Sequence, residues 1–463
     1  MQLSNRRKLI RRVGFVLVEN LLISLCVLIA VALRFFFERD VIFAYKFVFY
    51  KAFLIASICQ LSFYYNDLYV VRLARQRREW IIKFIQSLAA AAILLSVVYY
   101  LFPSLIIGRG IFLITLALSP LAVIGWRMFY DRLSRIGPLR DRVVIIGSGS
   151  LARKIGEEVL HSHRDMYEIV GFVDEDPKKM GESVVNPKVI GDYSALSAIV
   201  SQHDIDRVIV ALPDRRGKLP VHSLLECKFQ GTFIEDGVSF YEQLVGKIVV
   251  DNLKPSWFIF SSGFRQFRLA RITKRVLDVF LATVALLISL PLFPIIALLI
   301  RLDSPGPVFF RQERVGEDEK VFTLLKFRSM RVDAEADTGP VWAQHQDSRT
   351  TTVGRFIRTT RLDELPQLIH VLKGDMSFVG PRPERPFFVE VLLKEVPYYS
   401  VRHTVKPGIT GWAQIKYSYG ASKEDALEKL QYDLFYIKNL SVWLDLTILF
   451  ETIKVVLLGR GAR

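Results

Sequence analysis

Four long apolar runs in the first 130 residues constrain this chain more than any other feature. They cover Val13–Phe36, Phe43–Tyr64, Trp80–Phe102 and Ile106–Phe129. A helix of roughly 20 apolar residues crosses a hydrocarbon core about 30 Å thick, so each run predicts a membrane span. A buried helical bundle in a soluble protein is the alternative, but it does not explain how charge alternates between the connecting segments. We therefore predict a four-helix transmembrane bundle over residues 1–135.

The basic residues predict the orientation of these spans. They cluster before the first run, in the loop 66–79 and after the fourth run, whereas the other two connections are short and lack such clusters. By the positive-inside rule, both ends of the bundle face the cytoplasm. The formal net charge of +16 lies largely beside apolar segments, which favours anionic lipid headgroups over nucleic acid as its partner. We expect a membrane protein that binds no nucleic acid.

A fifth apolar run, Val279–Ile300, differs from the first four because Pro291 and Pro294 interrupt it. Proline removes a backbone donor and clashes with the preceding turn, so it kinks a helix. Basic residues lie on both sides of this run, which places both flanks on the cytoplasmic side. We predict a re-entrant membrane helix over residues 265–302, with a straight fifth span as the alternative.

The middle of the chain has the pattern of a doubly wound α/β domain, which we place at 140–250. A short apolar strand leads into a GxGxxA turn that contains Gly147 and Gly149, and a second strand ends at Asp174. Strands are expected at 142–147, 168–173, 207–212 and 231–234, with a helix over 151–160. In dinucleotide-binding domains, such glycines approach a pyrophosphate and such an acid binds a ribose. The same glycines allow a helix to pack on a strand without any ligand, so both readings stay open.

An acidic pair, Asp363 and Glu364, opens an apolar-periodic segment over 362–373 that we expect to be helical. Acids in a first helical turn commonly just complement the helix dipole. Here, however, the neighbouring segments carry several basic side chains and a loop rich in proline and arginine at 380–386. Carboxylates among arginines suit phosphoryl chemistry, with one as nucleophile and the other as metal ligand.

Several motifs in the last third resemble the bacterial sugar transferases, the monotopic polyprenyl-phosphate phosphoglycosyl transferases. The segments that carry the resemblance are 326–330 (KFRSM), 362–367 (LDELPQ), 374–383 (GDMSFVGPRP) and 406–412 (KPGITGW). Residues 1–250 resemble the four-span and Rossmann-like parts of the long, exopolysaccharide-associated members. Segments 214–220, 255–257 and 459–463 look like the subgroup linked to PEP-CTERM systems.

This resemblance implies a reaction, a site and a location. Asp363 would attack the β-phosphate of a UDP-sugar and release UMP, and a polyprenyl (undecaprenyl) phosphate would then accept the sugar phosphate. Glu364 would bind Mg²⁺. Residues expected to contact phosphate or nucleotide are Lys326, Arg328, Arg358, Pro381, Arg382 and Pro383. The resemblance also implies an α+β catalytic domain over 303–463 on the cytoplasmic side of the bacterial inner membrane.

Two other functions remain open from the sequence. A nucleotide-responsive scaffold of polysaccharide assembly would use the acidic pair only structurally, and a membrane-bound oxidoreductase would rest on the glycine turn alone. The motifs do not identify the sugar, and they leave a homodimer open.

Overall fold

The computed structural model describes residues 2–35, 47–66, 68–69, 77–135, 140–164, 166–212, 219–250, 258, 263–264, 268–332, 349–417, 420 and 422–457. Most of segment 214–220 and all of 255–257 and 459–463, which carry the PEP-CTERM resemblance, lie outside these residues. The chain divides into two compact units, Met1–Arg140 and Asp141–Arg463.

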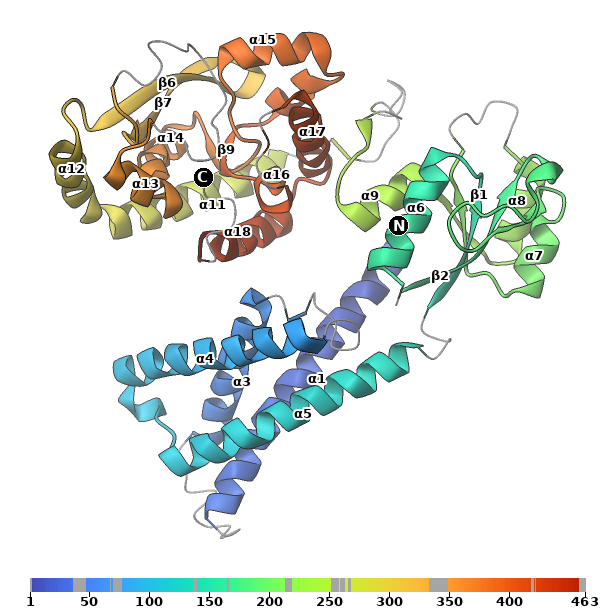
Figure 1. The fold of residues 1–463 in the computed structure, drawn as a ribbon, viewed down its shortest axis with the longest axis horizontal. Coiled ribbons are helices and arrows are strands. Elements are labelled where there is room, and N and C mark those ends of the chain that lie inside the picture. Colours follow the sequence, from blue (N-terminus) through green and yellow to red (C-terminus); the bar gives the residue numbers. More distant parts are fainter. Residues whose placement is uncertain are drawn as a thin grey trace. The chain divides into compact units, whose positions relative to one another are not determined.

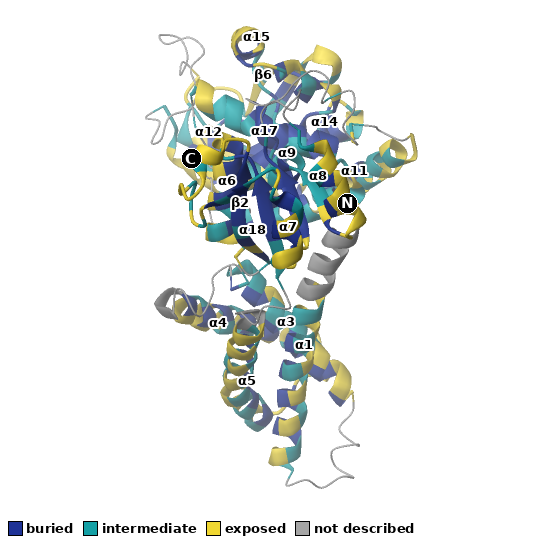
Figure 2. Ribbon diagram, turned by 90° about the vertical axis from the view of Figure 1, so that its right-hand side faces the viewer, coloured by how far each residue is buried: buried dark blue, intermediate teal, exposed yellow. Residues whose placement is uncertain are grey.

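The first unit contains the four predicted apolar helices. They are α1 (Gln2–Arg34), α3 (Val48–Tyr65), α4 (Arg77–Leu101) and α5 (Arg109–Arg135), shown in Figure 1. Each includes a stretch of 18 to 22 residues that is long and apolar enough to cross a membrane. Their buried faces share one apolar core, while many large apolar residues on the same helices are exposed, and Figure 2 shows exposed positions along these helices. Apolar side chains on the outer face are what a lipid environment requires.

The middle of the chain folds into a five-stranded parallel sheet, which confirms the predicted α/β domain. The strands are β1 (Asp141–Ile146), β2 (Tyr167–Asp174), β3 (Val189–Asp192), β4 (Arg207–Val210) and β5 (Phe233–Asp236), in the order β3-β2-β1-β4-β5. Strand β3 is additional to the four that we predicted. Strand β5 begins two residues later than expected, because Gly231, with a φ of 96°, still belongs to the turn after the preceding helix.

Helices cover both faces of this sheet. Helices α6 (Ser150–Ser162) and α9 (Gly237–Val245) pack on the face of Val143 and Ile145. Helices α7 (Leu196–Gln202) and α8 (Val221–Phe229) pack on the opposite face. Alternate residues of β1 therefore point into two separate cores, so the strand is apolar throughout. Figure 2 shows the buried residues concentrated in the strands.

The end of the middle domain is packed into the core of the C-terminal region. Ile248 and Val250 belong to an apolar cluster formed with residues of the C-terminal helices. Trp412 donates its indole N–H to the carbonyl of Gly246 at 2.7 Å. The side chains of Glu242 and Lys438, each 4% exposed, form a buried ion pair at 2.6 Å. Residues 242–250 therefore connect the two regions structurally.

The fifth apolar run forms two helices with a bend between them. Helices α11 (Arg268–Ser289) and α12 (Leu292–Asp303) meet at 60°. Pro291 lies at the break, whereas Pro294 lies in the first turn of α12, where the missing backbone donor costs little. The Ser289 hydroxyl donates to the carbonyl of Leu286 at 3.2 Å. Both a broken span and a re-entrant loop are compatible with this geometry.

The remaining elements build the C-terminal region around a hairpin and a short parallel pair. The hairpin consists of β6 (Phe309–Val315) and β7 (Val321–Phe327), and the pair of β8 (Ser377–Val379) and β9 (Gly408–Thr410). The helices are α13 (Thr352–Thr359), the 3₁₀ helix η6 (Leu362–Gln367), α14 (Leu368–Lys373), α15 (Pro386–Glu395), the 3₁₀ helix η7 (Tyr399–Thr404), α16 (Trp412–Lys416), α17 (Lys423–Lys438) and α18 (Val442–Leu457).

Candidate active site

The acidic pair lies on a tight 3₁₀ turn, not on the first turn of a regular α-helix as predicted. Helix η6 carries both acids and contains Pro366, and the α-helix begins only at Leu368. Proline cannot donate the backbone hydrogen bond that an α-helix would need there. Arg361 precedes the turn with a φ of 59°, a left-handed conformation that is uncommon for a side chain of this size.

His370 fixes this turn against the neighbouring hairpin. Its Nε2 accepts a hydrogen bond from the backbone N–H of Leu325 at 3.2 Å, and its Nδ1 lies 3.1 Å from Asp375. The Leu325 bond requires Nε2 to be unprotonated, so Nδ1 carries the proton and donates it to Asp375. Lys326 follows Leu325 directly in β7, so His370 also sets the position of that lysine relative to the acids.

Glu364 is buried and surrounded by cations. Its Oε1 lies 2.7 Å from Arg382 Nη2, 3.3 Å from Lys326 Nζ and 3.7 Å from Arg361 Nη1. Burial alone would oppose ionisation, but the surrounding positive charges, Arg382 first, hold the pKa of Glu364 below its ordinary value. For Lys326, burial also disfavours the charged form, and it therefore lowers the pKa of this lysine. Glu364 is therefore a carboxylate held in one position.

Asp363 is as buried as its neighbour, at 7% exposure, yet it is not held in the same way. Within the described residues, no hydrogen bond or ion pair engages its carboxylate. Burial raises the pKa of Asp363, and the adjacent charge of Glu364 raises it further, while Lys326 and the nearby arginines partly offset both. The pair thus consists of one carboxylate that cations hold in place and one that no described hydrogen bond or ion pair engages.

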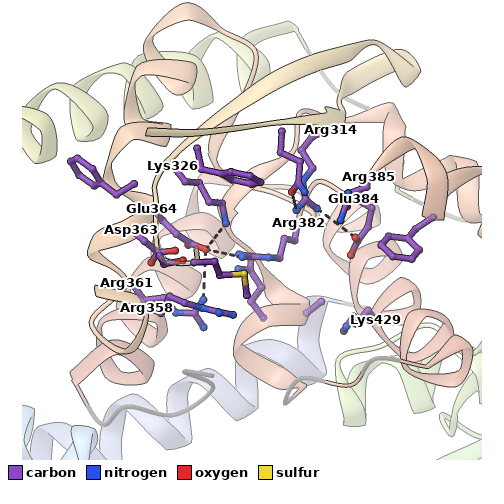
Figure 3. A pocket seen from close by; sticks show the side chains of 18 of the residues that line it. Arg314, Lys326, Arg358, Arg361, Asp363, Glu364, Arg382, Glu384, Arg385 and Lys429 are labelled. Carbon is purple, nitrogen blue, oxygen red and sulfur yellow. Dashed lines mark hydrogen bonds and ion pairs between the residues drawn. The ribbon is translucent and has the colours of Figure 1, made fainter. Parts of the chain in front are cut away.

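Both acids line a cavity of about 410 Å³ in the C-terminal region. Figure 3 shows Lys326 and Arg382 pointing toward Glu364 from different elements, with Lys429 of α17 in another part of the same cavity. Arg358 of α13 also lines it, and its charge favours the ionised form of Asp363. A volume of this size is in the range of sites for small ligands, and arginine and lysine side chains are the groups that commonly bind phosphate in proteins.

Arg382 is carried by an irregular loop whose carbonyl groups are bound by several other segments. The carbonyl of Pro381 accepts from the Gly408 N–H at 2.9 Å, and that of Pro383 accepts from Arg314 at 2.9 Å. Neither proline has a backbone N–H, so the loop cannot pair as a strand. The prolines of this motif thus fix the path of the backbone on either side of Arg382.

Arg328, which is also predicted to contact phosphate, binds backbone carbonyls and not the acidic pair. The terminal nitrogens of Arg328 donate to the carbonyls of Ser304 at 2.7 Å and Pro305 at 2.5 Å, which ties β7 to the turn after α12. The guanidinium lines the cavity but is engaged by backbone, so its contact with phosphate stays a prediction.

Several cavity residues are not among those that the sequence predicted. These are Arg314, Arg361, Glu384, Tyr399, Arg402, Lys429 and Asp433. They come from segments far apart in the chain, and only their chemical type would have signalled them.

The glycine turn of the middle domain has features that suit a nucleotide-binding role and features that suit a purely structural role. Gly147 has a φ of 101°, and a Cβ there would lie 3.0 Å from the Ala211 carbonyl oxygen, so the fold itself requires this glycine. A Cβ at Gly149 would meet nothing within 4 Å. Asp174 is bound by the Ser148 hydroxyl and, at 3.0 Å, by Lys179. Although burial opposes ionisation, these donors hold the pKa of Asp174 below its usual value. A nucleotide at this turn stays a prediction.

Comparison with known proteins matches two regions of the chain to described families. The family model described as bacterial sugar transferase matches residues 269–459, and one described as a CoA-binding domain matches residues 64–226. The UDP-glucose:undecaprenyl-phosphate glucose-1-phosphate transferase of Escherichia coli (strain K12) is 39% identical over 330 residues, which cover 68% of this chain and 67% of that protein. The chain belongs to the bacterial sugar transferase family.

Two further members of the family match over different lengths. The UDP-N-acetylgalactosamine-undecaprenyl-phosphate N-acetylgalactosaminephosphotransferase of Aeromonas hydrophila is 45% identical over 224 residues, 48% of this chain and 52% of that protein. The undecaprenyl-phosphate glucose phosphotransferase of Komagataeibacter xylinus is 35% identical over 335 residues, 70% of this chain and 60% of that protein. The chain thus matches between about half and two thirds of these relatives' lengths.

Proposed function

We propose that this sugar transferase moves a sugar 1-phosphate from a UDP-sugar to undecaprenyl phosphate, with Asp363 as the nucleophile. A carboxylate oxygen of Asp363 forms a bond to the β-phosphorus, and the bond from that phosphorus to the bridging oxygen breaks, so that UMP leaves. The phosphate of the lipid then attacks the same phosphorus and frees Asp363. The names of the Escherichia coli and Aeromonas hydrophila relatives specify UDP-glucose and UDP-N-acetylgalactosamine, each with undecaprenyl phosphate, so the sugar itself is left to experiment.

The difference between the two adjacent acids carries this proposal. A nucleophile must be ionised and able to move toward phosphorus, whereas a group that orients cations must stay fixed. Asp363 has no ion-pair partner among the described residues, and Glu364 has three. Arg358, Arg382 and Lys326 stand where they can neutralise the oxygens of the transferring phosphate.

We further propose that Mg²⁺ assists the reaction. The described residues contain no group of three or more acidic, histidine or cysteine side chains that could hold a metal by themselves. Mg²⁺ at phosphoryl-transfer sites is commonly bound by only one or two carboxylates together with substrate phosphates, and the pair at 363–364 fits that donor set. The ion pairs of Glu364 with described residues all use Oε1, so its second carboxylate oxygen is the proposed ligand. Bound there, the ion would neutralise charge on the pyrophosphate.

We place the enzyme in the bacterial inner membrane with its active site on the cytoplasmic side. The four apolar helices of the first unit and their basic flanks support this orientation, and the 60° bend at Pro291 supports a re-entrant path for α11 and α12. A re-entrant path keeps residues 303–463 on the side where nucleotide sugars are made, beside the headgroup of a lipid phosphate. The resemblance to members linked to exopolysaccharide assembly suits a first step in building repeat units.

A UMP-release assay over UDP-glucose, UDP-galactose and their N-acetyl counterparts tests the proposal. With undecaprenyl phosphate present, one of these sugars should give sustained release. With UDP-sugar alone, wild type should give a burst close to the amount of enzyme and carry sugar phosphate on Asp363, detectable by mass spectrometry. Asp363→Asn should abolish both the burst and the adduct while leaving the fold intact. Release only when lipid is present, with no adduct, would establish direct transfer instead.

A further inference from the structure

A buried arginine that takes no part in the proposed chemistry holds the backbone that presents Arg382. Arg402 lies in η7, and its side chain is 7% exposed. Its Nη2 donates both to the carbonyl oxygen of Arg382 at 2.9 Å and to Asp433 Oδ2 at 3.0 Å. Its Nη1 donates to the Tyr399 hydroxyl at 2.5 Å. The planar guanidinium is therefore bound on two sides and has a fixed orientation.

Asp433 holds the Arg402 side chain in place. It lies on α17, and its side chain is only 2% exposed. The helix is itself well anchored, because it begins with a reciprocal capping box at Ser422 and Asp425. A buried carboxylate on a rigid helix thus holds the arginine, and the arginine holds the loop.

The loop needs such a device because its own sequence prevents regular pairing. Pro381 and Pro383 lack backbone donors, so the segment around Arg382 cannot form a regular strand ladder, and the Arg402 side chain supplies the donor for the Arg382 carbonyl. The arginine side chain then reaches Glu364 Oε1 at 2.7 Å. A shift of its backbone would move the guanidinium relative to both acids and to any phosphate bound between them.

We propose that Arg402 and Asp433 are positioning residues for the transfer reaction and act through Arg382. This inference rests on the proposed function, since it assigns the pair a role in the same site. The pair sets where the Arg382 guanidinium stands and touches no reacting atom. A misplacement of about 1 Å can cost a hundredfold in rate, so disturbing the pair should cost about ten- to a hundredfold.

A double-mutant cycle in the full-length protein tests this inference. Asp433→Asn and Arg382→Ala are made singly and together, and kcat/KM for UMP release is measured with the best UDP-sugar of the panel. If the pair acts through Arg382, Asp433→Asn should lower kcat/KM in the wild-type background but by less than about threefold when Arg382 is already alanine. An equal loss in both backgrounds would overturn the inference and indicate either direct substrate contact or a general loss of structure.

The same cycle on the affinity for UDP, measured by calorimetry, does not depend on turnover. It therefore decides the question even if Arg382→Ala leaves too little activity to follow. Should Asp433→Asn fail to fold, Tyr399→Phe replaces it, because it removes only the hydroxyl that accepts from Arg402. Failure of the wild type to release UMP from any UDP-sugar would refute the proposed function, whereas an active wild type with additive losses would refute only the positioning role.

Glu242→Gln is the matched control. It disturbs another buried ion pair of α17, the one with Lys438, and no hydrogen bond or ion pair between described residues joins that pair to Arg382. This variant should lower stability, yet its effect on kcat/KM should be small and the same in both backgrounds. Coupling to Arg382 as strong as that of Asp433→Asn would show that α17 acts only through overall stability, and it would overturn the inference.

Discussion

Removing one member of the buried ion pair between Glu242 and Lys438 should strongly destabilise the C-terminal region. Both side chains are 4% exposed, their charged atoms lie 2.6 Å apart, and Asn439 donates to the other oxygen of Glu242 at 3.2 Å. Replacing one member of a buried pair costs about 3–5 kcal/mol, because the remaining charge stays out of water. For a domain of 150–250 residues, each kcal/mol lowers the melting temperature by about 2–4 °C. We therefore expect Glu242→Gln to lower the apparent melting temperature by about 6–20 °C.

The double variant Glu242→Gln with Lys438→Met separates the charge effect from a loss of packing. It removes both charges, and replacing a whole buried pair by uncharged groups is often close to neutral. Thermal unfolding of the full-length protein in detergent, followed by intrinsic fluorescence, should show the double variant recovering most of the loss. A double variant at least as unstable as the sum of the single changes would refute the reasoning, as would a shift below about 1 °C in Glu242→Gln.

The same contacts determine where a catalytic fragment has to begin. Ile248 and Val250 are 0% and 4% exposed and lie in the C-terminal core, and burial of such side chains is worth about 1.5–3 kcal/mol each. A fragment that begins at residue 265 loses both side chains together with Glu242, so it should be less stable than one that begins at 236. Equal melting temperatures for the two fragments would show that residues 237–250 do not belong to the catalytic fold.

Two further predictions concern the site and the membrane segment. The raised pKa of Asp363 should place the acid limb of the UMP-release profile above that of an ordinary aspartate near pH 4, because activity is lost as falling pH protonates the nucleophile. Lys326→Met removes a cation that favours the ionised form, so it should move this limb to higher pH; an unmoved limb would assign the titration to another group. Pro291→Ala should straighten the bent helix more than Pro294→Ala, because only Pro291 lies at the break. A cysteine at position 318 should resist an impermeant reagent from outside in the parent protein and become reactive in Pro291→Ala, whereas labelling of the parent would establish a true fifth span.

The sequence predicted those parts of the fold that depend on local pattern. Long apolar runs mark membrane-length helices whatever their neighbours are, and the run ending at Ile146 followed by Gly147 marks a buried strand and a turn. Strand β3 was missed because Val189–Asp192 is only four residues long and has a glycine inside it. The 3₁₀ turn at the acids was missed because the apolar spacing around Leu362 and Leu365 resembles that of an α-helix, although Pro366 disfavours an α-helix at this position.

The parts of the site that depend on contacts between distant segments could not be predicted from local sequence patterns. Arg402 and Asp433 are 31 residues apart and meet only when η7 packs on α17. Nothing in the residues beside either one signals a partner, since arginine and aspartate are ordinary surface residues in most contexts. Ile248 shows the same limit at a domain boundary, because an apolar residue near a predicted domain end does not reveal which core it enters.

The contrast between Asp363 and Glu364 follows from how the surrounding cations are directed. In sequence they are interchangeable, adjacent acids with the same basic neighbours. In the structure, Lys326 from β7 and Arg382 from the proline loop both form ion pairs with Glu364, so the charge of Glu364 holds these cations in place. Asp363 shares the burial and is repelled by its neighbour, and the same cations offset these effects only in part, which leaves its ionised form higher in energy and therefore more reactive. Glu364→Gln would consequently release the cations toward Asp363, lower its pKa and weaken it as a nucleophile, an effect distinct from any loss of metal and measurable as an acid limb that moves to lower pH.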